Sequence, residues 1–270
     1  MGTESHNRGI ALWGSGNSGK TWLIWAFVKE LQRLEEKDSD LSFRLSAKNA
    51  SGSWNQLLWE PPQGTPTHSS CDYEWRFEKH GGNSSSNQGG VQPATVLLFD
   101  DKGTRTVRAP LEPTKYRNTY YTLTHTAQGV LIALDHQDGY SNFERLKAVA
   151  SLLALLESSA TEDKPRYAAV CITKMDENEL AGIKDWDVWE LIEARFGKDM
   201  KLELTKFKRR GETGAHLFLR CFKVSSVGFL LDTNQTNYDS GQNKLRDEDN
   251  WYPWKVSEPF LWLFNQLGLT

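Results

Sequence analysis

The sequence predicts a three-layer α/β fold, in which helices cover both faces of a mostly parallel central sheet. Two observations support this prediction. Short apolar segments typical of buried strands alternate with amphipathic segments typical of helices along most of the chain. A chain of 270 residues is also long enough to bury one large core. We find no internal repeat and no clear boundary, so we expect a single domain over residues 1–270.

The first part of the chain is predicted to contain one helix and three strands. Residues 8–13 form an apolar run typical of a buried strand, and residues 21–31 have the apolar pattern of a helix. Residues 38–70 are polar and irregular, so we expect an insertion there. Residues 73–77 and 94–99 predict two strands, which a glycine-rich polar tip joins as a hairpin.

The middle of the chain continues the alternation. Residues 113–127 are weakly patterned but predicted to be helical, and residues 129–134 predict a strand in the centre of the sheet. Ser141 and Glu144 have the spacing of a capping box, which predicts the start of a helix. Residues 167–172 predict the next buried strand.

The last part is predicted to add two helices and one strand. Asp185 is expected to cap a helix over residues 186–196, and Gly197 is expected to end it. Residues 217–224 predict a strand, and the final helix is predicted to begin at Ser257. We place insertions near residues 38–70, 79–92, 198–216 and 232–250.

Residues 14–21 (GSGNSGKT) carry the strongest functional signal, because they match the phosphate-binding pattern G-x-x-x-x-G-K-[ST]. The loop lies between a predicted strand and a predicted helix, where backbone N–H groups and the helix N-terminus can bind phosphates. We expect Lys20 to act as a catalytic residue that reaches the β- and γ-phosphates, and the Thr21 hydroxyl to bind Mg²⁺. A glycine turn that binds nothing is the alternative. The residues expected to contact a nucleotide here are Gly14, Ser15, Gly16, Asn17, Ser18, Gly19, Lys20, Thr21 and Trp22.

Two further segments are candidates for binding Mg²⁺ and a γ-phosphate. Asp100 and Gly103 fit the pattern D-x-x-G directly after an apolar strand, so the carboxylate could hold a water on Mg²⁺ and the glycine N–H could meet the phosphate. A threonine in the long loop before residue 73 is expected to bind Mg²⁺ and to take part in catalysis. Thr67 is our choice and Thr65 is the second candidate; the alternative is that neither binds metal.

The ends of the next two predicted strands suggest which base is bound. Thr173, Lys174 and Asp176 fit [NT]-K-x-D, and the Asp176 carboxylate can accept hydrogen bonds from guanine N1–H and the 2-amino group. Adenine lacks this pair of donors, so the contact would select guanine, while the stem of Lys174 could pack along the base. Ser225 and Ser226 follow the next strand, where a backbone N–H could bind guanine O6. An exposed polar turn is the alternative for residues 173–176.

In this order the segments resemble the Ras-like, translation-factor-related (TRAFAC-class) P-loop GTPases. The resemblance implies the P-loop NTPase fold, GTP and GDP as ligands, and Mg²⁺ as cofactor. It also implies a molecular switch, in which the triphosphate orders loops near residues 50–70 and 101–112 and hydrolysis releases them. Residues 251–262 are similar to the closing helix of bacterial GTPase domains of the double-GTPase type.

One departure from that family bears on the activity. The residue after Gly103 is Thr104, where Ras-like enzymes commonly have a glutamine that orients the attacking water. We therefore expect slow GTP hydrolysis, accelerated by a protein effector or activator. Two alternatives stay open: a regulatory or scaffold module that binds the nucleotide without hydrolysing it, and a P-loop ATPase that uses Asp100 and Asp101 as metal ligand and acid. The segment at 173–176 argues against the ATPase.

Composition indicates which kinds of partner and which cellular compartment to expect. The net charge is −3, so no overall positive field points to nucleic acid, although residues 201–210 are locally basic. Three cysteines lie far apart without metal-binding spacing, which is typical of a reducing cytoplasm. No run of 18 apolar residues predicts a membrane span. Asp135, His136 and Asp138 also follow a predicted strand, and we interpret them as structural or peripheral.

Overall fold

The computed structural model describes most of the chain and shows the predicted three-layer α/β arrangement. The described residues are 8–37, 41–47, 71–79, 94–100 and 107–268, without 136, 138, 178–180, 232 and 243. One seven-stranded sheet has the order β2-β3-β4-β1-β5-β6-β7, and a two-stranded hairpin lies apart from it. The strands are β1 (Arg8–Gly14), β2 (Leu41–Ala47), β3 (Cys71–Lys79), β4 (Ala94–Asp100), β5 (Ala127–Leu134), β6 (Arg166–Ile172), β7 (Leu217–Lys223), β8 (Tyr238–Asp239) and β9 (Lys244–Leu245).

The direction of the strands decides where a ligand can bind. Strands β4, β1, β5, β6 and β7 are mutually parallel, whereas β3 is antiparallel to both of its neighbours. The antiparallel β3–β4 pair confirms the predicted hairpin. The carboxyl ends of the five parallel strands meet at one edge of the sheet, which is where α/β sheets bind ligands.

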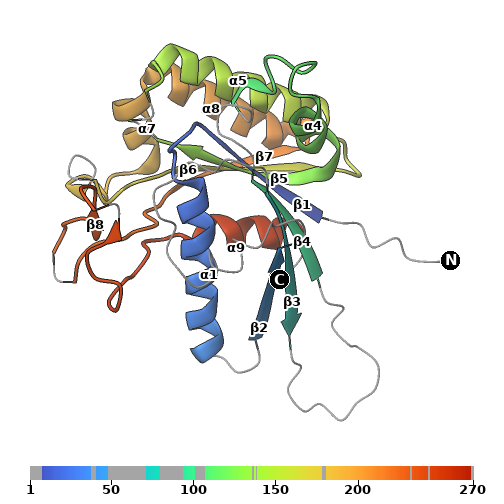
Figure 1. The fold of residues 1–270 in the computed structure, drawn as a ribbon. Helices are drawn as coiled ribbons and strands as arrows, with labels where there is room; N and C mark the ends of the chain where they lie inside the picture. The colour runs from blue at the N-terminus through green and yellow to red at the C-terminus, as the bar shows by residue number, and fades with distance from the viewer. Residues whose placement is uncertain are drawn as a thin grey trace, which may run out of the picture.

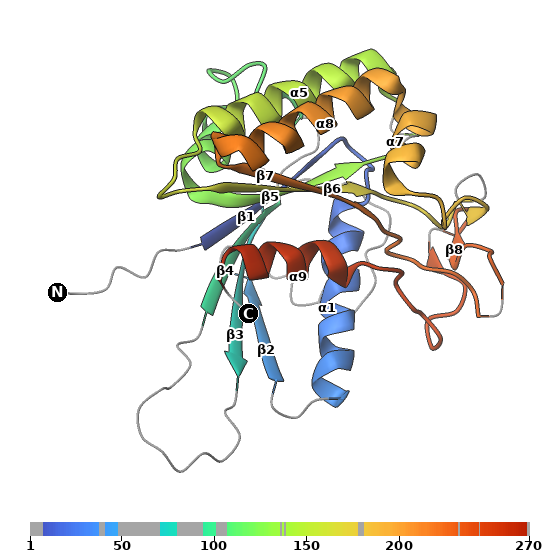
Figure 2. The same cartoon turned by 180° about the vertical axis from the view of Figure 1, so that it is seen from behind.

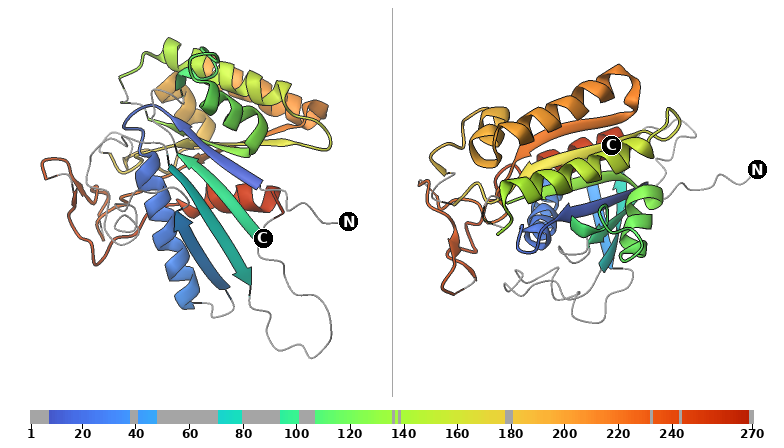
Figure 3. Two further views of the ribbon diagram at one scale, coloured as in Figure 1. Left: turned by 45° about the vertical axis from the view of Figure 1, so that its right-hand side comes forward. Right: turned by 90° about the horizontal axis from the view of Figure 1, so that it is seen from above.

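The helices lie on both faces of the sheet. They are α1 (Lys20–Lys37), α4 (Arg117–Tyr121), α5 (Asn142–Ser158), α7 (Val188–Phe196), α8 (Lys198–Arg210) and α9 (Ser257–Gln266), with short π-helical turns η1 (Thr122–Thr126) and η2 (Gly211–Ala215). Figure 1 shows α1 and α9 below the sheet and α5, α7 and α8 above it, and the view from behind agrees (Figure 2). Seen from above, α5 and α8 run side by side across the sheet (Figure 3). Among the described helices, none is long and apolar enough to cross a membrane.

The alternation of side chains along each central strand divides the core into two halves. In β1, Ile10 and Leu12 pack with α1 and α9, whereas Ala11 and Trp13 pack with the helices of the opposite layer. The first half is held by aromatic rings: Phe27 of α1 stacks on a ring of α9 with 4.1 Å between centroids. Such stacking fixes α1, and with it the loop that precedes this helix.

Two local predictions from sequence were wrong. Residues 41–47 form β2 within the range expected to be irregular, and β2 pairs antiparallel with β3. The cap of α7 is Asp187 rather than Asp185, because the Asp187 carboxylate accepts the hydrogen bond from Trp189 N at 2.8 Å. By contrast, the capping box of Ser141 and Glu144 at the start of α5 is confirmed.

The range 198–216, where the sequence predicts an insertion, holds α8 and η2. Met200, Leu204 and Phe207 of α8 are buried in the core between α8 and the sheet. The basic side chains of this helix make ion pairs at the surface, such as Lys201 with Glu193 at 2.6 Å. The local basic cluster is thus one face of an amphipathic helix.

Candidate nucleotide-binding site

The loop of residues 14–21 connects the end of β1 to the start of α1, at the carboxyl edge of the sheet. Gly14 lies close to the neighbouring strand: a Cβ built there would be 2.7 Å from the carbonyl oxygen of Ala133 in β5. No residue with a side chain could occupy this position without displacing β5, because such contacts are shorter than any normal packing distance. Because Gly14 has no side chain, the loop can begin directly beside β5.

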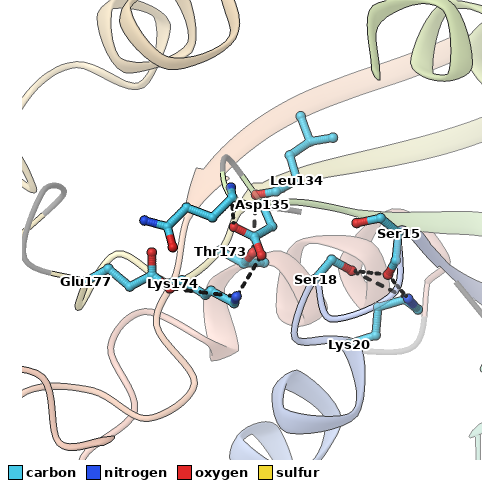
Figure 4. Close-up of polar contacts among 9 residues, drawn as sticks. Ser15, Ser18, Lys20, Leu134, Asp135, Thr173, Lys174 and Glu177 are labelled. Atoms are coloured by element: carbon cyan, nitrogen blue, oxygen red, sulfur yellow. Dashed lines mark hydrogen bonds and ion pairs between the residues drawn. The ribbon is translucent and has the colours of Figure 1, made fainter. Parts of the chain in front are cut away.

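Lys20 folds its side chain back across this loop. Its ammonium donates a hydrogen bond to the carbonyl oxygen of Ser15 at 2.7 Å (Figure 4). It also donates to the carbonyl oxygen of Gly14 at 3.0 Å, and the residue is buried. The Ser18 hydroxyl donates to the same Ser15 carbonyl at 3.0 Å. These bonds gather the lysine charge and the N-terminus of α1 within one loop, with Thr21 in the first helical turn. Such a concentration of positive potential suits a polyphosphate.

A second polar group lies beside this loop, at the ends of β5 and β6 (Figure 4). The Lys174 ammonium is 2.7 Å from the buried Asp135 carboxylate and 3.7 Å from Glu177. Burial, the largest single cause, lowers the pKa of Lys174, but the charge and hydrogen bond of Asp135, together with the charges of Glu177 and Asp176, outweigh it, so the pKa lies above its ordinary value. Burial raises the pKa of Glu177 to about 6, against the opposing charge of Lys174. Asp135, interpreted from sequence as structural or peripheral, therefore anchors one of the predicted site residues.

Asp176 lies deep in the same edge, and two hydroxyl groups bind its carboxylate. Ser225 donates to Oδ1 at 2.5 Å, and Thr236 donates to Oδ2 at 2.6 Å. Burial raises the pKa of Asp176, while the hydrogen bonds from Ser225 and Thr236 oppose that rise. A carboxylate has about four lone-pair sites, so the two hydroxyls and the backbone N–H of Asp176 itself leave capacity for a further hydrogen bond.

The structure brings together residues that lie far apart in the sequence. Thr173 donates its hydroxyl to the Leu134 carbonyl at 3.2 Å, which ties the end of β6 to that of β5. The carbonyl of Ser226 accepts a hydrogen bond from the indole of Trp251 at 3.0 Å. Trp22 packs against the core below the loop, and its ring contacts that of Tyr238 edge-on at 5.8 Å. Thr236 and Tyr238 were not among the residues predicted from sequence.

Other predicted site residues cannot be placed in the same detail. Thr65, Thr67, Asp101, Gly103 and Thr104 lie outside the described residues, as do most of the two predicted switch loops. Asp100 ends β4, where its backbone pairs with Leu12 of β1 in parallel register. This places residue 100 on the strand beside the one that leads into the phosphate-binding loop. Within the described part of the chain, no group of three or more His, Cys, Asp and Glu side chains could hold a metal ion.

Comparison with known proteins gives matches of structure only. No protein-family model matches the sequence, and no curated protein does. A solved structure of Roco2 RocCORdC from Methanosarcina barkeri, bound to GDP, is 15% identical over 82% of this chain and 44% of its own, with a TM-score of 0.33. The GTPase-like domain of Ski7 from S. cerevisiae, bound to GTP, is 15% identical over 97% of this chain and 51% of its own, with a TM-score of 0.37.

These solved proteins bind guanine nucleotides, but the likeness to them is distant. This chain spans about half the length of each of the two. At such identities and TM-scores the likeness assigns no activity to this chain. What this chain itself shows is a three-layer α/β fold in which residues 14–21, which match a phosphate-binding pattern, connect β1 to α1.

Proposed function

We propose that this protein binds guanine nucleotides and hydrolyses GTP slowly to GDP and phosphate, with Mg²⁺ as cofactor. The observation that carries the proposal is that two groups of residues held by hydrogen bonds lie at one edge of the sheet. One is the loop of residues 14–21 with its buried Lys20, and the other is the buried Asp176 carboxylate held by two hydroxyl groups. The positively charged loop at a helix N-terminus suits a phosphate chain. The buried carboxylate suits the N–H donors of a base.

The residues of this chain would divide the work as follows. Lys20 and the N-terminus of α1 would neutralise the phosphates, and Asp176 would accept the two N–H donors of guanine. Thr21, Asp100 and Thr67 offer hydroxyl and carboxylate oxygens, the donors that Mg²⁺ prefers, and Thr21 and the Asp100 backbone lie at the same sheet edge. Bound Mg²⁺ would neutralise charge that develops between the β- and γ-phosphates.

The expected rate of hydrolysis is low, because Thr104 stands where a water-orienting glutamine is common. A threonine side chain is too short to copy the role of that glutamine. This favours a switch whose triphosphate state persists until a partner protein acts, and it also favours the alternative of a module that binds GTP without hydrolysing it. Release of phosphate in a single-turnover assay separates the two, since only the GTPase releases it.

The first test is a titration of the full chain with fluorescent GDP, GTP, ADP and ATP, with and without Mg²⁺. We expect micromolar or tighter binding of the guanine nucleotides and at least 10-fold weaker binding of the adenine ones, roughly the discrimination that one lost charge-assisted hydrogen bond brings. Equal or adenine-favoured binding would contradict guanine recognition and favour an ATPase. Binding of neither would contradict the proposal as a whole.

Two variants test separately the residues proposed to bind the phosphates and the residue proposed to bind the base. Lys20→Ala should weaken all four nucleotides by about 10-fold or more, because it removes a charge from the phosphate loop. Asp176→Asn should weaken only the guanine nucleotides, and it should improve xanthine nucleotides, whose base carries a carbonyl in place of the 2-amino group. Asp163→Asn is the matched control, since Asp163 is exposed in the turn that precedes β6, at the opposite edge of the sheet. An unchanged preference in Asp176→Asn would remove Asp176 from base recognition.

A further inference from the structure

The segment between Gly228 and Trp254 folds back onto the carboxyl edge of the sheet (Figure 1). The end of the segment is joined to the chain just before its start, because Trp254 and Ser225 exchange backbone hydrogen bonds of 2.8 and 3.0 Å. Within the segment, Asn237 is fully buried and donates its backbone N–H to the Gly228 carbonyl at 3.1 Å. We call residues 229–254 the strap.

The strap places one hydroxyl group on Asp176. Thr236 accepts a hydrogen bond from the backbone N–H of Tyr238 at 3.1 Å and donates its own proton to Asp176 Oδ2 at 2.6 Å. Asn237, the next residue, bonds through its side chain to both backbone groups of Asp247, each at 2.8 Å. Hydrogen bonds therefore hold the turn that carries Thr236, whose hydroxyl oxygen accepts one bond from the backbone while its proton is donated to Asp176.

Aromatic rings attach the strap to the helix that follows the phosphate loop. Tyr238 contacts Trp22 edge-on, and Trp251 stacks on Trp25 with 4.1 Å between centroids. Trp22 directly follows Thr21, so the strap is anchored within the first turns of α1. Thr236 thus occupies a position fixed relative to both the phosphate loop and Asp176.

We propose that Thr236 is a positioning residue for guanine recognition: with Ser225 it fixes the plane of the Asp176 carboxylate, so that the remaining lone pairs point to the base. This inference rests on the proposed function. The terminal torsion of an aspartate is broad, so one hydroxyl on one oxygen leaves the carboxylate free to turn. A second hydroxyl on the other oxygen removes that freedom before the base arrives.

The test compares nucleotide selectivity in three variants of the full chain. Thr236→Val keeps the shape of the side chain and removes the hydroxyl, Thr236→Ser keeps the hydroxyl, and Thr233→Val removes a hydroxyl of the same strap that bonds the Leu230 carbonyl. Fluorescent GDP, IDP and ADP are the probes, since IDP lacks the 2-amino group and ADP lacks both guanine donors. The ratio of affinities for GDP and ADP is the main readout, because a purely structural loss would lower both affinities alike.

We expect Thr236→Val to lower the ratio of GDP to ADP affinity by about 10-fold, the effect of one lost hydrogen bond to a charged group. The ratio of GDP to IDP should fall as well, Thr236→Ser should restore both ratios, and Thr233→Val should leave them unchanged. If Thr236→Val does not fold, Thr236→Cys replaces it, since a thiol is only a weak donor.

Three results would overturn the inference. Unchanged affinities for both GDP and ADP in Thr236→Val, in a protein whose wild type prefers GDP, would show that Asp176 needs no second hydroxyl while leaving the proposed function intact. Equal losses of GDP and ADP affinity would show a role in stability only. A wild-type protein that does not distinguish GDP from ADP would overturn the proposed function together with this inference.

Discussion

Gly228 is where a single added methyl group should have its largest effect on the edge of the sheet. Its φ is +71°, in the left-handed region that favours glycine. A Cβ at this position would be 1.9 Å from the carbonyl oxygen of Tyr252, so that the backbone of the strap has to move by about 1 Å to reach a separation of 3.0 Å. Gly228→Ala therefore combines backbone strain with a clash against a second segment.

The two costs can be separated in size. An alanine in the left-handed region costs about 1–2 kcal/mol, and the lower freedom of the unfolded chain returns about 0.4–1 kcal/mol, so strain alone leaves about 1 kcal/mol. The clash adds about 1–3 kcal/mol, as other forms of overpacking do. We expect Gly228→Ala to lower the free energy of unfolding by about 2–4 kcal/mol in total.

The matched control is Gly139→Ala. Gly139 has a similar φ of +80°, but a Cβ there would meet no atom within 4 Å. Urea denaturation followed by tryptophan fluorescence gives the free energy of unfolding of both variants. Equal losses in the two, or a loss at Gly228 near that of strain alone, would refute the clash and with it the close seating of the strap on residue 228.

Three further predictions concern stability and can use the same urea denaturation. Phe27→Ala should cost about 3–5 kcal/mol, because its fully buried ring holds α1 to α9, whereas Phe143→Ala at an exposed position should change the free energy by less than about 0.5 kcal/mol. Asp187→Ala should cost about 1 kcal/mol as the loss of a helix cap, and Asp185→Ala should cost little; the reverse order would contradict the assigned cap. Glu177, with a pKa raised to about 6, holds its proton more tightly in the folded protein than in the unfolded chain, so stability should fall as the pH rises from about 4 to 7. Glu177→Gln should remove up to about 2 kcal/mol of that fall, and identical pH profiles would contradict the raised pKa.

The layers of the fold follow from patterns that are local in the sequence. Apolar runs predict the central strands, and Ser141 with Glu144 marks the start of α5 correctly, because capping depends on residues three apart. The strand β2 was missed although Leu41, Phe43 and Leu45 alternate with polar residues, since a long polar stretch follows them. The α7 cap was assigned two residues too early, because Asp185 and Asp187 both fit the pattern and only the backbone chooses between them.

The candidate site also has one part that local sequence predicts and another part that it does not. The phosphate loop is a continuous motif, so its position between β1 and α1 follows from residues 14–21 alone. The bonds of Lys20 to the Gly14 and Ser15 carbonyls were not predicted from the sequence. The contacts of Asp176 with Thr236 and of Lys174 with Asp135 join residues far apart in the chain, and no local pattern reports such pairs. The roles of Thr67 and Gly103 stay predictions, because both lie outside the described residues.

The strand order has a consequence for how this protein is made. β1 leaves the ribosome first but pairs with β4 and β5, with Arg8 opposite Val96 and Gly9 opposite Ala127. Closing loops of this length costs entropy before any contact forms, which slows folding. The partner of Asp176 on the strap is synthesised 60 residues after it. The sheet can therefore form only after most of this chain has emerged. Until then the apolar β1 segment lacks its neighbouring strands and is exposed to aggregation.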